Sequence, residues 1–111
     1  MGIVDITELP SFSKKIRNIL TKKEKEALYD FLMEHPEKGD IIVGTGGIRK
    51  LRWAENNKGK RGGARIIYYY HVVGSIIYLM ACYTKNEQST ISHEVKKQLK
   101  NIVLQIKERI S

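Results

Sequence analysis

Seven cationic side chains lie between Arg49 and Arg65, against a single anion, Glu55. This segment therefore has a net charge of +6, whereas the remainder of the chain holds 13 cations and 11 anions. Lysine and arginine at this density attract phosphate groups, and one guanidinium can bind two phosphate oxygens at once. The residue types and their spacing favour binding to, or chemistry on, a polyanionic chain.

Three of these cations, Lys58, Lys60 and Arg61, lie in a glycine-rich loop expected between two strands, Glu55 to Gly63. Glycines let the backbone approach a ligand closely, which suits a phosphodiester chain. A basic loop can also be only a solvated hairpin that keeps a protein soluble. Here the charges continue into the flanking strands, and Arg65 shares strand parity with Ile67, Tyr69 and His71, so polyanion binding is the favoured interpretation.

Aromatic residues among and beside these cations favour single-stranded RNA over duplex DNA. No helix-turn-helix recognition helix is evident in the sequence. At least half of these aromatic side chains are expected to serve only in the core of the sheet. The candidate stacking residues are Trp53, Tyr68, Tyr69, Tyr70, Tyr78 and Tyr83.

Other kinds of catalytic site find little support in the sequence. The spacing of His, Cys, Asp and Glu predicts no metal site, and neither a nucleophile motif nor a phosphate-binding G-x-x-x-x-G-K-[ST] loop is present. His35 and His93 are expected to be surface or capping residues, and His71 is more often a structural histidine than a general acid or base. We therefore expect neither a metal nor a cofactor.

The elements that position these residues follow from local signals. Ile3 to Leu9 suits a first or edge strand, and Ser11 could cap a short helix after Pro10. Thr21 and Glu24 have the form of a capping box, so a second helix is expected from Lys22 to before Pro36. The glycines of 39–47 predict a buried connection around Ile41-Ile42-Val43 rather than a long strand.

The second half of the chain predicts a three-stranded antiparallel meander closed by a helix. Its strands are expected at 48–54, 66–73 and 75–83, with a tight hairpin at Gly74-Ser75. Arg49, Leu51 and Trp53 should face one side of the first of these strands, and Lys50 and Arg52 the other. From Ser92 onward apolar residues form one helical stripe: Val95, Leu99, Ile102, Val103, Ile106 and Ile110.

Length and composition place these elements in one α+β domain spanning residues 1–111. No apolar run approaches the roughly 20 residues that a membrane span requires, and no secretory signal is evident. The single cysteine, Cys82, excludes an internal disulfide and suits a reducing compartment. We expect a cytoplasmic protein without a membrane partner.

Two strings carry a resemblance to a known family: GTGGIRKLR at 44–52 and KGKRGGARIIYYY at 58–70, followed by YLMACYTKNEQ at 78–88. The chain resembles the RelE superfamily of type II toxins, and most closely the HigB-like branch. The resemblance implies a compact α+β fold in which an N-terminal strand and a two-helix hairpin pack on an antiparallel sheet with a C-terminal helix. It implies a ribosome-dependent, metal-independent endoribonuclease that cuts mRNA in the 16S rRNA decoding site and inhibits translation. A HigA-like helix-turn-helix antitoxin is the implied partner.

Roles for individual residues follow from the same resemblance. Attack of a ribose 2′-OH on the adjacent phosphate needs a base, an acid and cations. Arg65 matches the family arginine that clamps the scissile phosphate, and Lys85 and Tyr83 match a second cluster. Either Lys60 or Lys58 could act as base, and Glu87 could orient Lys85, while the general acid stays open. The expected RNA-binding residues are Lys58, Arg61, Arg49, Lys50 and Arg52.

Two other functions remain open at this stage. A ParE-like toxin of the same fold would inhibit DNA gyrase, and a plain RNA-binding module would cleave nothing. Arg65 and Lys85 favour cleavage, because a gyrase inhibitor does not need them. Arg49, Lys50 and Arg52 could simply lie on an exposed strand face. This explanation of their charges is almost as good as contact with RNA.

Overall fold

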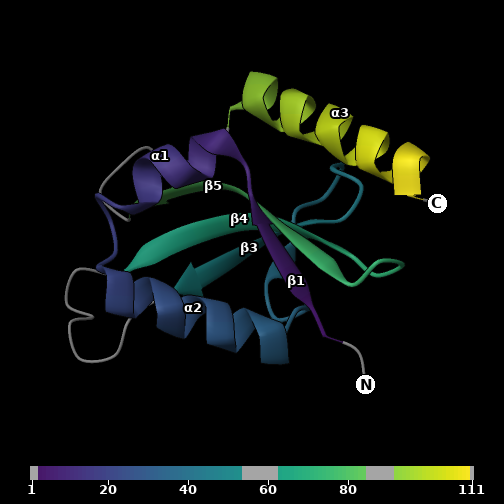
Figure 1. Ribbon diagram of the computed structural model, residues 1–111. Helices are drawn as coiled ribbons and strands as arrows, with labels where there is room; N and C mark the ends of the chain where they lie inside the picture. Colours follow the sequence, from purple (N-terminus) through teal and green to yellow (C-terminus); the bar gives the residue numbers. More distant parts are fainter. Residues whose placement is uncertain (1–2, 54–62, 85–91, 111) are drawn as a thin grey trace.

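The computed structural model describes residues 3–53, 63–84 and 92–110. It contains one mixed sheet of five strands in the order β1-β5-β4-β3-β2. Helices α1 and α2 cover one face of this sheet and α3 covers the other (Figure 1). The α+β fold with an N-terminal strand, a helical hairpin, an antiparallel meander and a C-terminal helix is confirmed.

The N-terminal part contains the elements that its sequence signals predict. Strand β1 (Asp5–Glu8) lies at the edge of the sheet and runs parallel to β5. Helices α1 (Pro10–Ile16) and α2 (Lys22–Glu34) follow it. The capping box is confirmed: the Thr21 hydroxyl accepts from the Glu24 amide, and the Glu24 carboxylate accepts from the Thr21 amide.

The expected cap of α1 is wrong. Leu9 occupies the capping position without a side-chain hydrogen bond, and Pro10 is the first helical residue, where its missing N–H costs nothing. The Ser11 hydroxyl instead donates to the Met80 carbonyl on β5, at 2.6 Å. Ser11 therefore joins the helix to the sheet.

The connection after α2 also differs from the expectation. It contains a two-residue strand, β2 (Asp40–Ile41), paired with β3, and of its three apolar residues only Ile42 packs against a core cluster. Ile41 is 49% exposed and Val43 is 84% exposed. The segment is anchored through Thr45, whose buried hydroxyl donates to the Ile42 carbonyl and accepts from the Ile48 amide. Hydrogen bonds of Thr45 therefore hold the loop, where burial of its apolar side chains was expected.

The antiparallel meander is confirmed. It consists of β3 (Ile48–Trp53), β4 (Ala64–His71) and β5 (Ile76–Thr84), and residues 72–75 form the turn between the last two strands. Ser75 has a φ of 55°, and its amide donates to the Val72 carbonyl. The pairing of β4 with β5 contains one irregularity, because Ile67 pairs with Ala81 and Tyr68 pairs with Leu79. Met80 is therefore the extra residue of a β-bulge.

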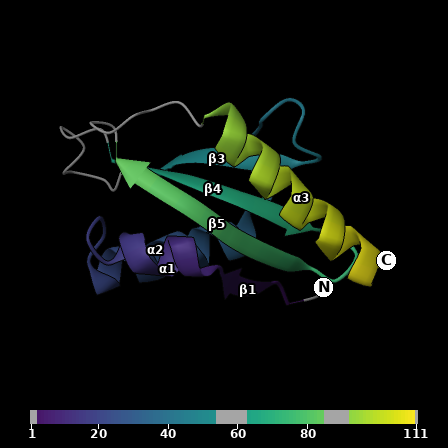
Figure 2. The same ribbon diagram turned by 90° about the horizontal axis from the view of Figure 1, so that it is seen from above.

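Each face of the sheet contributes to its own core cluster. Phe12, Ile16, Leu28 and Leu32 of α1 and α2 pack with Tyr68 and its neighbours on one face. Helix α3 (His93–Ile110) places Leu99, Val103 and Ile106 against the other face (Figure 2). The predicted apolar stripe is confirmed for Leu99, Ile102, Val103 and Ile106, whereas Val95 is 41% exposed. At the start of the helix the Ser92 hydroxyl accepts from the Val95 amide.

Candidate active site

Three of the expected site residues lie in one row across the meander. Arg52 on β3 pairs with Arg65 on β4, and Arg65 pairs with Tyr83 on β5. Directly opposed residues on neighbouring strands have Cβ atoms about 4.5–5.5 Å apart, so their side chains lie within reach of one ligand. The row lies next to the end of the sheet, because β3 ends at Trp53 and β5 at Thr84.

The row faces the same side of the sheet as α3. Ile48 and Ile67, which share strand parity with Arg52 and Arg65, belong to the core cluster that α3 completes. The two arginines differ in burial: Arg52 is exposed and Arg65 is partly buried. The site thus lies against the sheet on the side that α3 covers.

The β-bulge brings Tyr83 into this row. Tyr78 and Met80 face α3, and a regular strand would turn odd-numbered residues such as Tyr83 to the opposite face. The extra residue at the bulge reverses the alternation, so that Ala81 and Tyr83 also lie on the α3 side. Because the Met80 carbonyl accepts from Ser11, α1 holds the bulge in place.

The electrostatics of the row suit an anion with several oxygens. Arg52 and Arg65 lie opposite each other on neighbouring strands, and a guanidinium group can bind two oxygens of one phosphate. Burial raises the pKa of Tyr83 above its ordinary value of 10.0, and the Arg65 charge opposes this rise only in part. The phenol is therefore protonated at neutral pH and can donate a proton.

The ring of Tyr83 is held in the core, while its hydroxyl group carries the proton. The side chain is 9% exposed and belongs to the cluster that contains Leu99 and Val103 of α3. Tyr68 and Tyr69 are buried as well, so three of the six candidate aromatic residues lie in the core clusters. That at least half of the six serve only the core stays a prediction. Of them, only Tyr83 pairs with a cation in the row.

Lys50 and Arg49 take opposite sides of β3, as the alternation predicts. Lys50 is exposed and shares strand parity with Arg52. The Arg49 guanidinium donates instead to two backbone carbonyls, of Glu37 at 2.9 Å and of Gly39 at 2.7 Å. Arg49 thus lies away from the row and ties β3 to the loop after α2, and contact between Arg49 and RNA stays a prediction.

The remaining expected site residues lie outside the part of the chain that the structure describes. They are Lys58, Lys60, Arg61, Lys85 and Glu87. In the sequence, one of the two segments that contain them follows Trp53 and the other follows Thr84. Their roles stay predictions.

The histidines lie away from the row. His71 is at the opposite end of β4, buried, with Nδ1 3.0 Å from the Tyr69 hydroxyl. Its Nε2 has no hydrogen-bond partner among residues 3–53, 63–84 and 92–110. His93 is exposed at the start of α3.

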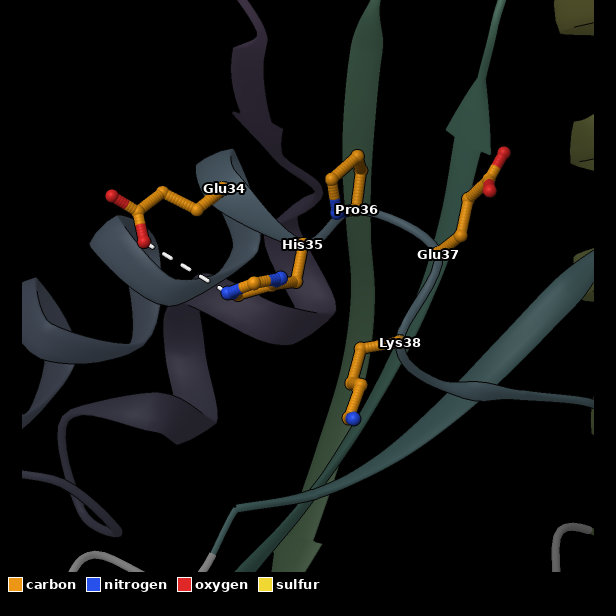
Figure 3. A pocket seen from close by; sticks show the side chains of 5 residues that line it. All are labelled: Glu34, His35, Pro36, Glu37 and Lys38. Carbon is orange, nitrogen blue, oxygen red and sulfur yellow. Dashed lines mark ion pairs between the residues drawn. The ribbon is translucent and has the colours of Figure 1, made fainter.

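His35 ends α2 and lines an open surface pocket of about 310 Å³ with Glu34, Pro36, Glu37 and Lys38. Its Nε2 lies 3.8 Å from Glu34 Oε1, whereas the Glu37 carboxylate points away (Figure 3). In the described part of the chain no three His, Cys, Asp or Glu side chains are placed to hold a metal ion. The pocket thus lacks convergent catalytic groups.

Two solved structures share the fold. An E. coli RelE toxin, a double mutant in the free state, matches 92% of this chain and 99% of its own length with a TM-score of 0.61 and 16% identity. The archaeal RelE-RelB complex from Pyrococcus horikoshii OT3 contains a chain that matches 78% of this one and 100% of its own length, with a TM-score of 0.53 and 19% identity. At these identities the matches show the fold alone.

One curated relative matches only a segment. FAD-dependent oxidoreductase domain-containing protein 1 of Mus musculus is 33% identical over 63 residues, or 54% of this chain. The chain spans 13% of the length of that protein, so this match carries no argument about activity. Among the described residues no helix is long and apolar enough to cross a membrane.

The family comparison covers most of the chain. Residues 33–109 match the model of the RelE toxin of the RelE / RelB toxin-antitoxin system. That range begins within α2 and includes the whole meander, with the Arg52, Arg65 and Tyr83 row, and nearly all of α3. This chain belongs to the RelE toxin family of toxin–antitoxin systems.

Proposed function

We propose that this chain is a ribosome-dependent mRNA endoribonuclease, the toxin of a type II toxin–antitoxin pair in the cytoplasm. Membership of the RelE toxin family supports this proposal. The observation that carries it is the cross-strand row in which Arg65 lies between Arg52 and Tyr83. An arginine pair can stabilise the negative charge that develops during phosphodiester cleavage, and a protonated phenol beside it can donate a proton to the leaving oxygen.

The proposed reaction is transfer within the RNA strand. The ribose 2′-oxygen attacks the adjacent phosphorus, a base takes the 2′-OH proton, and the bond from phosphorus to the 5′-oxygen breaks. Arg65, with Arg52, binds the nonbridging oxygens as negative charge gathers on them. Tyr83 donates its proton to the leaving 5′-oxygen, so that the products are a 2′,3′-cyclic phosphate and a 5′-OH.

The other proposed roles belong to residues beside the row. Lys58 or Lys60 accepts the proton of the 2′-OH, since neighbouring cations favour a neutral amine. Lys85, oriented by Glu87, is part of the same cluster. Lys50 and Arg61 bind the RNA backbone, and the ribosome presents the mRNA in the 16S rRNA decoding site.

An antitoxin is the proposed protein partner. One of the matched structures is a complex of RelE with RelB, and a net charge of +8 favours an acidic partner here. We propose a HigA-like antitoxin with a helix-turn-helix domain, which would silence the toxin by covering the arginine row. This assignment and the HigB-like branch rest on the sequence resemblance.

Mapping of RNA 5′ ends after brief induction tests the proposed function. The wild type should arrest growth and produce new 5′ ends at fixed positions within codons of translated mRNA. Arg65→Ala should produce neither, while it keeps its fold and its binding to the antitoxin. Growth arrest with DNA damage and without codon-linked 5′ ends would instead favour gyrase inhibition.

A further inference from the structure

A carboxylate and an ammonium group lie on opposed residues beside the arginine row. Asp40 on β2 pairs with Lys50 on β3, and Lys50 is two residues before Arg52 on the same strand. Residues two apart on a strand lie about 7 Å from each other on one face of the sheet. Asp40 and Lys50, which we call the edge pair, therefore belong to the next row beside Arg52 and Arg65.

The edge pair faces the same side of the sheet as the arginine row. Ile42 and Ile48, which share strand parity with Asp40 and Lys50, pack in the cluster that α3 completes. Asp40 and Lys50 themselves are exposed. Within residues 3–53, 63–84 and 92–110, neither side chain forms a salt bridge or a hydrogen bond. The edge pair thus offers a ligand both an acceptor and donors.

The backbone that carries Asp40 is held by its neighbours. The Gly39 amide donates to the hydroxyl of the buried Tyr68 at 2.9 Å, and the Gly39 carbonyl accepts from the Arg49 guanidinium at 2.7 Å. A side chain at position 39 would lie 2.9 Å from the Tyr68 ring, so the close packing there requires glycine. The Asp40 carboxylate is therefore attached to a fixed backbone, as a group that discriminates between ligands must be.

An exposed carboxylate at this place does not suit a surface that binds only phosphate. The charge of Asp40 would repel a phosphate, whereas its oxygens accept hydrogen bonds from N–H and O–H groups. A ribose offers only its hydroxyl, but a base edge carries N–H and C=O groups side by side, and single-stranded RNA exposes these edges. An acceptor opposite a donor therefore suits a base beside the phosphate that the arginine row binds.

Guanine is the base that matches the edge pair best. Its Watson–Crick edge has two adjacent N–H donors, at N1 and N2, next to the O6 acceptor. The Asp40 carboxylate can accept from both donors, and the Lys50 ammonium can donate to O6. Adenine, cytosine and uracil each place an acceptor beside the N–H donor, so one carboxylate oxygen would face a lone pair.

We propose that Asp40 and Lys50 bind the Watson–Crick edge of a guanine next to the cleaved phosphate and thereby set the sequence preference of cleavage. This inference rests on the proposed function, because it assigns specificity to the same reaction. The edge pair takes no part in the proton transfers. The Lys50 ammonium has three N–H groups, so it can contact O6 together with the RNA backbone.

Exchange of one base in the message tests this proposal without altering the protein. Full-length wild-type protein is mixed with ribosomes programmed with messages that carry guanine, inosine or adenine at either nucleotide flanking the cut, and single-turnover cleavage is measured. Inosine keeps the N1–H and O6 groups of guanine but lacks its amino group. At one of the two positions, the guanine message should be cleaved about ten times faster than the inosine message, or more.

Asp40→Asn is the matching change in the protein. A carboxamide has one acceptor and one donor group, which match the edge of adenine rather than that of guanine. The variant should lose the preference for guanine over inosine and should cleave the adenine message faster than the wild type does. Glu37→Gln removes the same charge at another exposed position of this connection and should keep the wild-type preference. Should Asp40→Asn perturb folding, the guanine and inosine messages with wild-type protein still decide.

Equal rates for the guanine and inosine messages in the wild type would overturn this inference and leave the proposed function intact, since cleavage would still occur. An unchanged preference in folded Asp40→Asn would also overturn it. An equal fall in rate for all three messages would do the same, because it would assign Asp40 to the proton of the 2′-OH. Weaker antitoxin binding with unchanged preference would assign the edge pair to the antitoxin instead. Absence of cleavage of every message by the wild type would contradict the proposed function, and this inference with it.

Discussion

At the scale of single residues, Arg65 is the central residue of the candidate active site. Arg65 is partly buried, with a second arginine opposite it on one strand and a protonated phenol opposite it on the other. Two guanidinium groups in this position can bind the nonbridging oxygens of a phosphate, on which negative charge increases in the transition state of phosphodiester cleavage.

Tyr83→Phe should separate the phenol proton from the packing of the ring. The ring stays in the core cluster with Leu99, so the melting temperature should change little, while cleavage of ribosome-bound mRNA should slow by about a hundredfold. Tyr78→Phe, in the same cluster, is the matched control and should retain nearly full activity. Equal rates for the two variants would rule out Tyr83 as the proton donor.

Arg49→Gln should mainly lower stability. The substitution removes the guanidinium that donates to the Glu37 and Gly39 carbonyls, and hydrogen bonds from charged donors contribute about 1.5–3 kcal/mol. Urea unfolding should show a loss of about this size, with little change in RNA affinity per folded molecule. Lys50→Gln is the control. Its free energy of unfolding should change little, whereas its affinity for RNA should fall.

At the scale of elements, the bulge in β5 and the start of α1 act together. Ser11 is in the first turn of α1 and donates to the carbonyl of Met80, the extra residue of the bulge. The helix thus fixes the point at which β5 changes its alternation. Tyr83 reaches the arginine row only because of that change.

Ser11→Ala should therefore lower the cleavage rate by more than its loss of stability can explain. We expect a loss of about 1 kcal/mol in the free energy of unfolding, together with a clear fall in the single-turnover cleavage rate of the folded protein. Ser13→Ala, which removes a hydroxyl bonded to Glu8 instead, should cost similar stability without slowing cleavage. If both variants cleave at the same rate, Ser11 is not a positioning residue.

Strand β1 is joined to both N-terminal helices through Glu8. Burial alone would raise the pKa of this carboxyl, but hydrogen bonds from Lys25, Ser13 and Tyr29 lower it below its ordinary value of 4.5. A lowered pKa in the folded state means that Glu8 stabilises the fold above pH 4.5 and loses this effect as the pH falls through the lowered value. Melting temperatures should decline below pH 4.5 less steeply in Glu8→Gln than in the wild type.

The same elements show which features the sequence could predict. Local signals were sufficient for the capping box at Thr21, for the strand alternation of Arg49 to Arg52, and for the stripe of α3. The pairing of Arg52 with Arg65 depends on register, which local propensity does not determine. The bulge at Met80 depends on a contact with Ser11, 69 positions earlier in the chain.

Two of the predictions differ from the structure, and each difference has a specific physical cause. Ser11 has the residue type of a helix cap, but Pro10 already begins the helix and the Ser11 hydroxyl finds a tertiary partner. The run Ile41-Ile42-Val43 has the composition of a buried segment, yet β2 pairs at the edge of the sheet and leaves two of these side chains exposed. Composition predicts burial only where a second layer covers the residues.

At the scale of the whole molecule, one end of the sheet gathers the charges that the proposed function needs. The arginine row lies on the α3 face, at the end where β3 and β5 stop (Figure 2). The proposed cleavage site therefore belongs to the face that α3 covers and not to the face that α1 and α2 cover.

The most direct test of the central proposal is a single-turnover measurement of mRNA cleavage on programmed ribosomes, with wild-type protein and with Arg65→Ala. The proposal predicts a rate reduced by at least about a hundredfold in the variant, while the variant stays folded and still binds the antitoxin. Cleavage by folded Arg65→Ala at close to the wild-type rate would contradict the assignment of the arginine row as the active site.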